Sequence, residues 1–325
     1  MTLGRSVLIT GATGSFGQAF VADLLRRGDV ERICCLSRDE LKQSVMADRF
    51  GHDPRLRFFL GDVRERDRLE MAFHGIATVI HAAALKRVDA SAYDPEEVRK
   101  TNIDGTTNVI RAAITEGVPR VVVLSSDKAV RATNFYGASK FMAEQIAVSA
   151  NAYAVPRGVR IACTRYGNVL GSRGSVLGVW RDHIANGRPL PLTNPAASRF
   201  WMSLADAVAL VRLAVDRMQG GEVFIPKLPA LTIRALASQV AGPDYPIRLT
   251  GLRPGGEKTH EELISPEEAA RTHDMGDVYV VAPHLASWRA TLPDYGPLVP
   301  AEFVYRSDTT GAPSVERLRE MLEAA

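Results

Sequence analysis

Short apolar runs alternate with longer amphipathic segments through the first half of the chain. The apolar runs lie at 7–10, 32–37, 57–60, 77–82, 120–125 and 160–165. Segments with helical periodicity separate most of them, at 16–27, 39–50, 102–113 and 136–151. Strands that alternate with helices in this way are typical of parallel sheets whose crossover helices cover both faces. The pattern therefore predicts an α/β fold built on a doubly wound parallel sheet.

The second half of the chain is less regular. Residues that break regular structure, and so predict loops, follow at Gly187, Pro189, Pro191 and Pro195. Helical patterns at 205–218 and 231–240 then flank a short apolar run at 222–226. These segments predict a smaller lobe that is interleaved with the sheet.

The composition is that of a soluble globular enzyme, since 46% of the residues are apolar and 24% are charged. A net charge of +3 without a block of Lys or Arg gives no reason to expect a nucleic-acid partner. No apolar stretch approaches the roughly 18 residues of a membrane span. The first apolar run leads directly into a glycine loop, which is not the pattern of a signal peptide. We therefore expect a cytoplasmic protein without a membrane partner.

The three cysteines form no metal-binding spacing. Cys34 and Cys35 are adjacent within an apolar run, and we expect them to be small hydrophobic residues of a strand. His260 and the two acidic residues after it lack the second histidine of a zinc-binding helix. The sequence thus predicts no metal site.

A glycine-rich loop follows the first predicted strand and opens the first predicted helix. Glycines in this position allow a tight turn and close backbone approach to a pyrophosphate, whose charge the helix N-terminus stabilises. A plain tight turn is the alternative, but the strand before and the helix after favour dinucleotide binding in a Rossmann-like fold. The residues that we expect to contact the cofactor here are Gly11, Thr13, Gly14, Ser15, Phe16 and Gly17.

The residues after the second strand select the dinucleotide. An acidic residue there binds the ribose of NAD, whereas a basic residue binds the 2′-phosphate of NADP. Here Ser37 and Arg38 come first, with Lys42 one helical turn further on. Asp39 and Glu40 are expected to be the cap and the first-turn acid of the next helix. Because Arg can bind a phosphate through two hydrogen bonds, the sequence predicts NADP.

Small and polar residues follow the third and fourth strands. An acid after the third strand is placed for the adenine, and its alternative role is to cap the following helix. Alanines after the fourth strand leave room for the ribose beside the nicotinamide, and the lysine beyond them is expected to face the active site. The contacts expected from this region are Asp62, Val63, Ala82, Ala83, Ala84 and Lys86.

The segment after the fifth strand is dense in titratable side chains. Tyr136 and Lys140 are spaced to lie on one face of a helix. There the charge of Lys140 would lower the pKa of the phenol and make it a base. Asp127 and Lys128 supply a second acid–base pair nearby. A simple dehydrogenase needs only the first pair, so a second chemical step after hydride transfer is predicted.

Together these motifs resemble the extended short-chain dehydrogenase/reductase family, and within it the inverting UDP-N-acetylglucosamine 4,6-dehydratases. The resemblance covers 7–265 and is fainter at 303–322. The segments that carry it are 37–43, 61–64, 81–86, 126–129, 165–169 and 171–176. The Asp127–Lys128 pair is its most specific element. Retaining sugar-nucleotide dehydratases usually have Asp-Glu there, and simple 4-epimerases lack the pair.

The resemblance implies a role for each residue of the centre. Tyr136 would take the proton of the sugar 4-hydroxyl, Ser126 would hydrogen-bond the 4-oxygen, and Lys140 would hold the cofactor ribose. Lys128 would remove the proton from carbon 5, and Asp127 would protonate the leaving 6-hydroxyl. A lysine base must be neutral, so we expect burial to depress the pKa of Lys128. The residues implied to hold the nucleotide sugar are Lys86, Asn168, Ser175, Val176, Arg199, Arg253 and Glu257.

Two segments depart from the family pattern. Arg131 lies in a segment, 130–135, where relatives usually have a loop that contains Asn-Pro. The segment 253–260 carries one glycine more than the usual motif, at Gly255 and Gly256. We expect these changes to alter what the sugar pocket and the nucleotide loop accept.

The leading hypothesis is a dehydratase of UDP-N-acetylglucosamine or a close relative. With bound NADP it would give a 4-keto-6-deoxy sugar nucleotide with inversion at carbon 5. A 4-epimerase would use Tyr136 but not the Asp-Lys pair, and a non-catalytic NADP-sensing regulator would be expected to lack Tyr136 or Lys140. We expect a homo-oligomer. Its dinucleotide-binding domain would comprise 1–165 with 200–225, and its substrate lobe 166–199 and 226–325.

Overall fold

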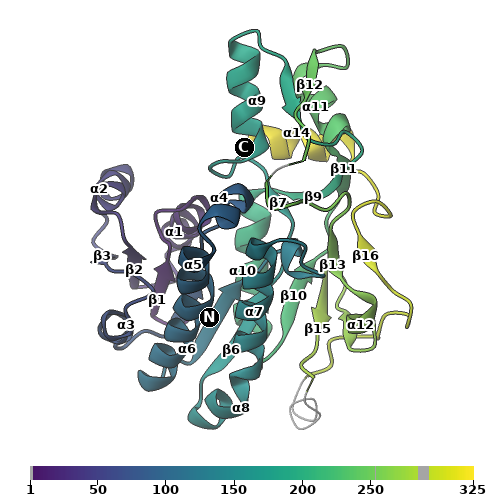
Figure 1. Ribbon diagram of the computed structural model, residues 1–325. Coiled ribbons are helices and arrows are strands. Elements are labelled where there is room, and N and C mark those ends of the chain that lie inside the picture. The colour runs from purple at the N-terminus through teal and green to yellow at the C-terminus, as the bar shows by residue number, and fades with distance from the viewer. Residues whose placement is uncertain (1–2, 253, 285–292) are drawn as a thin grey trace.

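A nine-stranded sheet forms the centre of the protein (Figure 1). The computed structural model describes residues 3–252, 254–284 and 293–325. From one edge to the other, the strands are β14 (Thr272–Asp274), β15 (Val278–Val281), β10 (Val223–Pro226), β6 (Arg160–Thr164), β5 (Arg120–Leu124), β4 (Thr78–His81), β1 (Ser6–Thr10), β2 (Arg32–Ser37) and β3 (Leu56–Leu60). Neighbours from β3 to β10 are parallel, and β15 and β14 are antiparallel.

Helices cover both faces of this sheet, which explains why its central strands are apolar along their whole length. Apolar side chains of α3, α6 and α7 pack on one face, and those of α1, α2 and α10 pack on the other. The bounds are α1 (Ser15–Arg27), α2 (Glu40–Arg49), α3 (Arg66–Phe73), α6 (Gly105–Thr115), α7 (Phe135–Ser149) and α10 (Leu204–Arg217). The predicted α/β fold with a doubly wound sheet is therefore confirmed. Cys34 and Cys35 are buried in β2, as their apolar surroundings predicted, and Cys163 is buried in β6.

A smaller lobe has its own apolar core, in which Trp180, Trp201 and Leu236 are buried. It lies at the top of Figure 1, where α9, α11 and α14 gather. Its helices are α9 (Val176–Ala185), α11 (Ile233–Ala241) and α14 (Val315–Glu323). Its strands are β7 (Asn168–Val169), β8 (Leu190–Leu192), β9 (Ser198–Met202), β11 (Ala230–Thr232) and β12 (Ile247–Leu249).

Several short elements complete the described chain. The helix predicted at 102–113 begins as a π-helix, η1, and continues as α6. β14 and β15 come from the segment assigned to the substrate lobe, yet they extend the large sheet. The division into two lobes stays a prediction. The remaining elements are α4 (Val88–Tyr93), α5 (Pro95–Val98), η1 (Arg99–Asp104), η2 (Asp127–Ala129), α8 (Asn151–Ala154), η3 (Val155–Arg157), β13 (Glu262–Ile264), α12 (Pro266–Ala269) and β16 (Tyr305–Arg306).

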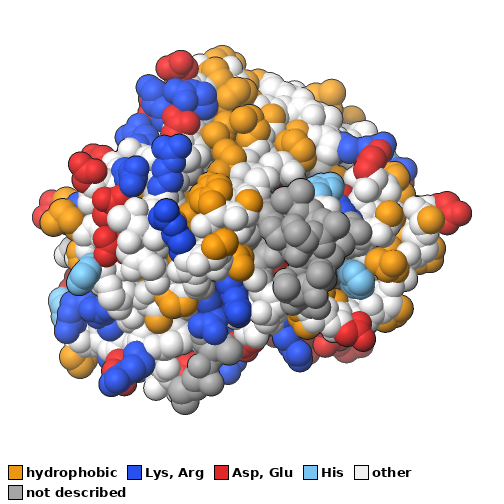
Figure 2. Space-filling model, turned by 90° about the horizontal axis from the view of Figure 1, so that it is seen from below, with side chains coloured by type: hydrophobic (Ala, Val, Ile, Leu, Met, Phe, Trp, Pro, Cys, Tyr) orange, Lys and Arg blue, Asp and Glu red, His pale blue; other side chains and the backbone are white. Residues whose placement is uncertain are grey.

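Hydrophobic side chains gather in a band on the face seen from below in Figure 2. Large exposed apolar side chains of the described chain include Phe141 and Met142 of α7, Tyr153 of α8 and Val155 of η3. None of the described helices combines the length and the apolar character needed to cross a bilayer.

Candidate active site

The glycine loop after β1 has the shape that a dinucleotide requires. Gly11 has φ +67°, and a Cβ on it would lie 2.9 Å from the backbone of Ala83. A Cβ on Gly17 would lie 2.5 Å from the Ala12 carbonyl oxygen, so only glycine lets α1 pack this closely. Gly14 is the N-cap of α1 without a side chain to satisfy the first amides, and no acidic residue occupies the first turn. The N-terminus of α1 thus keeps free donors and a positive field for an anion.

The basic residues after β2 are already paired with acids. Arg38 Nη1 lies 3.4 Å from Asp62 Oδ2, and its side chain is half exposed. Lys42 pairs with Asp39, whose carboxylate also caps α2 by accepting from the Lys42 amide at 3.0 Å. The predicted capping role of Asp39 is confirmed. Burial raises the pKa of Asp62, but Arg64 and Arg38 together hold it below its usual value.

Two buried polar residues hold the loop after β4. His81 bridges Thr10 Oγ1 at 2.8 Å and Thr106 Oγ1 at 3.0 Å. Burial, with a smaller effect of the Lys140 charge, lowers the pKa of His81 to about 3, so this imidazole is neutral and structural. Asn102 binds the backbone of Leu85 through both its amide oxygen, at 2.8 Å, and its amide nitrogen, at 2.9 Å. These hydrogen bonds fix the two ends of the segment that carries the alanines, next to Lys86.

The turn η2 places an acid and a base together at the carboxyl end of β5. Asp127 is completely buried, and its Oδ1 accepts hydrogen bonds from Ser126 Oγ at 2.8 Å and from Lys128 Nζ at 3.1 Å. Its Oδ2 is buried without a hydrogen-bond partner in the described chain. Burial raises the pKa of Asp127, and the Lys128 charge only partly offsets it. This carboxyl group is therefore easier to protonate than an exposed one.

The pKa of Lys128 differs from the expectation. Burial alone would lower it, but the carboxylates of Asp127 and Glu261 raise it above the usual range of lysine. The expected depression is thus wrong, because the Asp127 carboxylate at 3.1 Å opposes burial and a second carboxylate, Glu261 at 3.4 Å from Nζ, which the sequence did not reveal as a neighbour, adds to its effect. Lys128 also donates to Asn168 Oδ1 at 3.2 Å, so the structure brings the predicted substrate residue Asn168 to this centre.

Tyr136 and Lys140 lie on α7 beside the turn, but their electrostatics were also mispredicted. Burial raises the pKa of Tyr136, and the cation that opposes this effect is Lys128. Tyr136 is hydrogen-bonded to Ser126. The Lys140 ammonium donates to the Leu124 carbonyl, and burial lowers the pKa of Lys140 to about 8. Helical spacing places both residues on one face but does not determine which charge each one meets.

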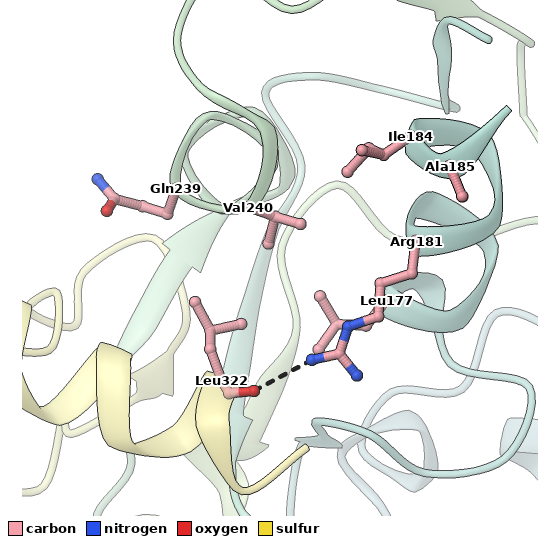
Figure 3. Close-up of a pocket in the computed structure, with 7 residues that line it drawn as sticks. All are labelled: Leu177, Arg181, Ile184, Ala185, Gln239, Val240 and Leu322. Carbon is pink, nitrogen blue, oxygen red and sulfur yellow. Dashed lines mark hydrogen bonds between the residues drawn. The ribbon is translucent and has the colours of Figure 1, made fainter. Parts of the chain in front are cut away.

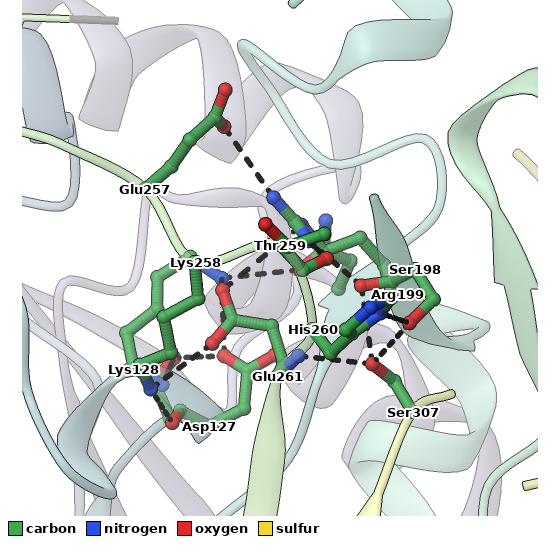
Figure 4. A network of polar contacts seen from close by, with 12 residues as sticks. Asp127, Lys128, Ser198, Arg199, Glu257, Lys258, Thr259, His260, Glu261 and Ser307 are labelled. Atoms are coloured by element: carbon green, nitrogen blue, oxygen red, sulfur yellow. Dashed lines mark hydrogen bonds and ion pairs between the residues drawn. The ribbon is translucent and has the colours of Figure 1, made fainter. Parts of the chain in front are cut away.

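A second segment reaches the centre from far along the chain (Figure 4). Glu261, just before β13, is 2% exposed and lies 3.4 Å from Lys128 and 3.2 Å from Lys258. Lys258 Nζ donates to the Val130 carbonyl at 2.6 Å. Neither residue was predicted for the site from the sequence. Glu261 follows His260 in a segment that resembles an incomplete zinc motif, and no local pattern places it opposite Lys128.

The predicted nucleotide-sugar residues divide into groups. Arg199 is buried, donates to the Thr259 carbonyl at 3.0 Å and lies 3.4 Å from Glu257 Oε2. The Glu257 Oε1 atom is buried without a hydrogen-bond partner in the described residues. Arg253 lies outside the described residues. Arg199 and Glu257 therefore form one cluster with Lys258 and Glu261 (Figure 4).

The other predicted residues lie near the glycine loop. Ser175 is the N-cap of α9, and Val176 is its first residue. The amide of Arg173 donates to Ser15 Oγ at 2.8 Å, which holds this segment against the start of α1. Burial lowers the pKa of Lys86, and the charge of Arg173 lowers it further. Arg173 is a further candidate that the sequence analysis did not single out, although it lies within the motif 171–176.

The two departures from the family pattern lie at the edge of the site. Arg131 has φ +45° and pairs with Glu262 and Glu267, each at 3.6 Å. Asn134, the N-cap of α7, accepts from the Gly137 amide at 2.8 Å and donates to the Gly256 carbonyl at 3.2 Å. The extra-glycine segment is therefore attached to the helix that carries Tyr136.

A cavity lies in the smaller lobe, away from η2 and α7. A pocket of about 390 Å³ opens between α9, α11 and α14, where Arg181 donates to the Leu322 carbonyl at 3.1 Å (Figure 3). Its lining includes none of the residues of η2 or α7. In the described ranges, no cluster of His, Cys, Asp and Glu has the composition of a metal site.

Comparisons with known proteins agree with this geometry. A family model described as "Polysaccharide biosynthesis protein" matches residues 7–283. The chain is 43% identical over 283 residues to a UDP-N-acetylglucosamine 4,6-dehydratase (inverting) of Campylobacter jejuni, covering 87% of this chain and 84% of that protein. It is 42% identical over 286 residues to a UDP-glucose 4-epimerase of Rickettsia rickettsii, covering 86% and 83%.

Solved structures share the fold. Pen from Bacillus thuringiensis has 33% identity and a TM-score of 0.89, with all of both chains covered. A double mutant of DesIV, a dTDP-glucose 4,6-dehydratase from Streptomyces venezuelae solved with NAD, has 25% identity and a TM-score of 0.71. The match covers 77% of this chain and 86% of DesIV.

Proposed function

Because the chain belongs to the polysaccharide biosynthesis protein family, whose model matches residues 7–283, we propose that it is a sugar-nucleotide 4,6-dehydratase. Its substrate is UDP-N-acetylglucosamine or a close relative, and its product is the 4-keto-6-deoxy sugar nucleotide. The relative from Campylobacter jejuni, 43% identical, carries the same activity in its name. Inversion at carbon 5 is part of the proposal and follows the name of that relative.

One observation carries the reaction type: a buried acid and a lysine share a contact of 3.1 Å beside Tyr136. Loss of water across carbons 5 and 6 needs a base at carbon 5 and an acid at the 6-oxygen. Moving one proton from Lys128 Nζ to Asp127 gives a neutral amine and a neutral carboxyl group together. Burial favours this neutral pair, because it opposes both charges.

The glycine loop fits a nicotinamide dinucleotide, and NADP is the form that we propose. When bound, it would supply the hydride-transfer chemistry by which carbon 4 is oxidised and carbon 6 is later reduced. Gly11, Gly14 and Gly17 leave the space and the free amides that a pyrophosphate needs. Arg38 is half exposed and pairs with Asp62 at 3.4 Å, a weak contact that leaves the guanidinium free to bind a 2′-phosphate.

The side chains of the centre take complementary parts in the proposed reaction. Tyr136 accepts the proton of the 4-hydroxyl, and Ser126, which contacts both Tyr136 and Asp127, orients the 4-oxygen. Lys128 removes the proton at carbon 5. The unpartnered Oδ2 of Asp127 is the oxygen that meets the 6-hydroxyl. Lys140 holds the cofactor ribose from its buried position on α7.

The described geometry also supports a binding place for the nucleotide sugar. We assign Asn168, Arg199 and Glu257 to the sugar and diphosphate, since Lys128 and Lys258 link them to the centre. We also assign Ser175 and Val176, at the start of α9, and Lys86 to the binding of the nucleotide sugar. Arg253 remains in the proposal on the resemblance alone.

A second candidate is a 4-epimerase, because the Rickettsia rickettsii relative bears that name at 42% identity. Such a reaction needs a base for the 4-hydroxyl and a cofactor, but it moves no proton at carbon 5. Complete burial of Asp127 beside Lys128 costs desolvation free energy, and an epimerase would not need this pair for its reaction. The dehydratase uses both residues and is therefore favoured.

One incubation separates these functions. The purified protein is mixed with UDP-N-acetylglucosamine in heavy water, and the products are measured by mass spectrometry. The dehydratase gives a product that has lost one water and carries deuterium at carbon 5. Interconversion of two sugars of unchanged mass would support the epimerase, and no reaction with any UDP-N-acetylhexosamine would contradict the proposed substrate class.

The location and the assembly of the protein are also proposals. A cytoplasmic location follows from the expected supply of nucleotide sugars and NADP. A homo-oligomer is suggested by the exposed side chains of Phe141, Met142, Tyr153 and Val155 along α7 to η3. Sedimentation of the purified protein tests the assembly.

A further inference from the structure

Glu261 is a buried carboxylate that the proposed chemistry does not use. It is 2% exposed, and its backbone is fixed on both sides by Ser307, whose Oγ accepts from the Glu261 amide at 2.9 Å and whose amide donates to the Glu261 carbonyl at 2.9 Å. A buried carboxylate is costly unless cations compensate it. Here the compensating cations are Lys128, Lys258 and Arg199, at 3.4, 3.2 and 4.0 Å.

The cations around Glu261 are not equivalent. Lys258 is anchored to the turn by the Val130 carbonyl at 2.6 Å and the Asp127 carbonyl at 3.4 Å. Arg199 is anchored by the Ser198 carbonyl at 2.7 Å and the Thr259 carbonyl at 3.0 Å. Within the described residues the Lys128 ammonium makes no such backbone contact, and its partners there are the side chains of Asp127, Asn168 and Glu261. The position of its ammonium group therefore depends on side-chain charges.

We propose that Glu261 is a positioning residue whose carboxylate holds the Lys128 ammonium against Asp127 and sets the pH at which Lys128 becomes a base. The catalytic consequence rests on the proposed function, but the titration of Lys128 does not. The ammonium group contacts two carboxylates, Asp127 at 3.1 Å and Glu261 at 3.4 Å. The charge of Glu261 favours the resting form, in which the proton is on Lys128.

The other charges near Lys128 act in known directions. Asp127, on the same turn, and Tyr136, on α7, favour the protonated amine, whereas Arg199, on β9, disfavours it. Lys258 acts on Glu261, which it compensates directly. Substitution of Glu261 and of Lys258 should therefore move the titration of Lys128 in opposite directions.

The test compares Glu261→Gln, which removes the charge and keeps the shape, with Glu261→Asp, which keeps the charge. Competitive acetylation of the substrate-free protein, followed by mass spectrometry of the peptide with Lys128, measures the titration of that amine. We expect Glu261→Gln to titrate lower by about 1–3 pH units, the usual effect of one close charge. Glu261→Asp should stay nearer to the native value. Glu267→Gln is the matched control, since its side chain is exposed and pairs with Arg131.

Lys258→Met removes a cation beside Glu261 and keeps the Glu261 carboxylate, so its effect on the titration of Lys128 should have the opposite direction. It should shift the titration of Lys128 upward, and this result is independent of whether Glu261→Gln folds. In an active dehydratase, the pH at which carbon 5 exchange begins should follow the same order. Equal titration of Lys128 in the native protein and in Glu261→Gln, or a downward shift in Lys258→Met, would overturn the inference. Ordered titrations with no dehydration would leave the inference standing and contradict the proposed function instead.

Discussion

Replacing Lys128 by methionine tests the centre most directly, because it removes the ammonium group and keeps an unbranched side chain that is only one atom shorter. The native ammonium lies 3.1 Å from Asp127, 3.4 Å from Glu261 and 3.2 Å from Asn168. After the change, Asp127 retains only the hydroxyl of Ser126 as a side-chain hydrogen-bond partner within the described residues. A completely buried carboxylate then lacks its cation.

The size of the effect follows from that burial. Removing one partner of a buried ion pair typically costs about 3–5 kcal/mol. Burial already raises the pKa of Asp127, and loss of the opposing Lys128 charge should raise it further. A carboxyl group whose pKa is higher in the folded state favours folding when protonated. The variant should therefore be close to native stability near pH 4 and lose stability as the pH rises through the folded pKa of Asp127.

Activity should respond separately from stability. General acid–base groups typically contribute about 10²–10⁴-fold, so dehydration and exchange at carbon 5 should fall by at least that factor. Substrate should still bind, and oxidation at carbon 4 should persist, because Tyr136 and Lys140 are unchanged. Urea unfolding between pH 4 and pH 8 measures the stability, and deuterium incorporation from heavy water measures the chemistry.

Two control variants isolate the cause. Lys227→Met removes a lysine from a half-exposed pair with Asp274 and should cost less than about 1 kcal/mol. Asp127→Asn combined with Lys128→Met removes both charges and should regain stability at pH 8 without regaining dehydration. Lys128→Met that incorporates deuterium at carbon 5 at the native rate would refute the base assignment. A stability loss of equal size at pH 4 and pH 8 would refute the electrostatic reasoning.

Three further predictions concern the cofactor and the fold. Arg38→Glu should weaken NADP binding by about 1.5–3 kcal/mol, the value of a charge-assisted hydrogen bond, and leave NAD binding nearly unchanged; calorimetry with both dinucleotides checks this, and equal losses for both would count against the 2′-phosphate contact. Gly17→Ala should destabilise the protein by about 1–3 kcal/mol, because the new Cβ meets the Ala12 backbone, whereas Gly178→Ala in α9 meets nothing within 4 Å and should stabilise by up to about 1 kcal/mol; urea unfolding of the pair checks the sign. Arg165→Met should cost about 3–5 kcal/mol, since it leaves the buried carboxylate of Glu144 and the partly buried carboxylate of Glu268 without their shared cation; a smaller loss than in Lys227→Met would be inconsistent with a buried ion pair.

The sequence by itself determined the parallel strands of the large sheet and the reaction class. Strands covered on both faces must be apolar throughout, so their runs are visible without any knowledge of their neighbours. β2 was predicted at its observed bounds, Arg32–Ser37. The resemblance carried by the Asp127–Lys128 motif is confirmed by the family match and by the 43% identical dehydratase. These signals are local, so one sequence is enough to recognise them.

The short strands outside the large sheet were not visible in the sequence. β7 and β16 have two residues each, and β8, β11 and β13 have three, which is too short for a period of two to appear. Their pairing is made by distant segments, such as β13 with β16. Such strands exist because the tertiary fold brings their partners together, and not because their own residues favour extended structure.

Only the tertiary structure decided the electrostatics of the centre. The spacing of Tyr136 and Lys140 predicted a lysine that lowers the pKa of the phenol, but the folded chain gives that part to Lys128. Burial was expected to depress the pKa of Lys128, but the carboxylate of Asp127, joined by that of Glu261 from a distant part of the chain, raises it instead. The sequence names the titratable groups of an active site, whereas their pKa values depend on distances between charges, which only folding sets.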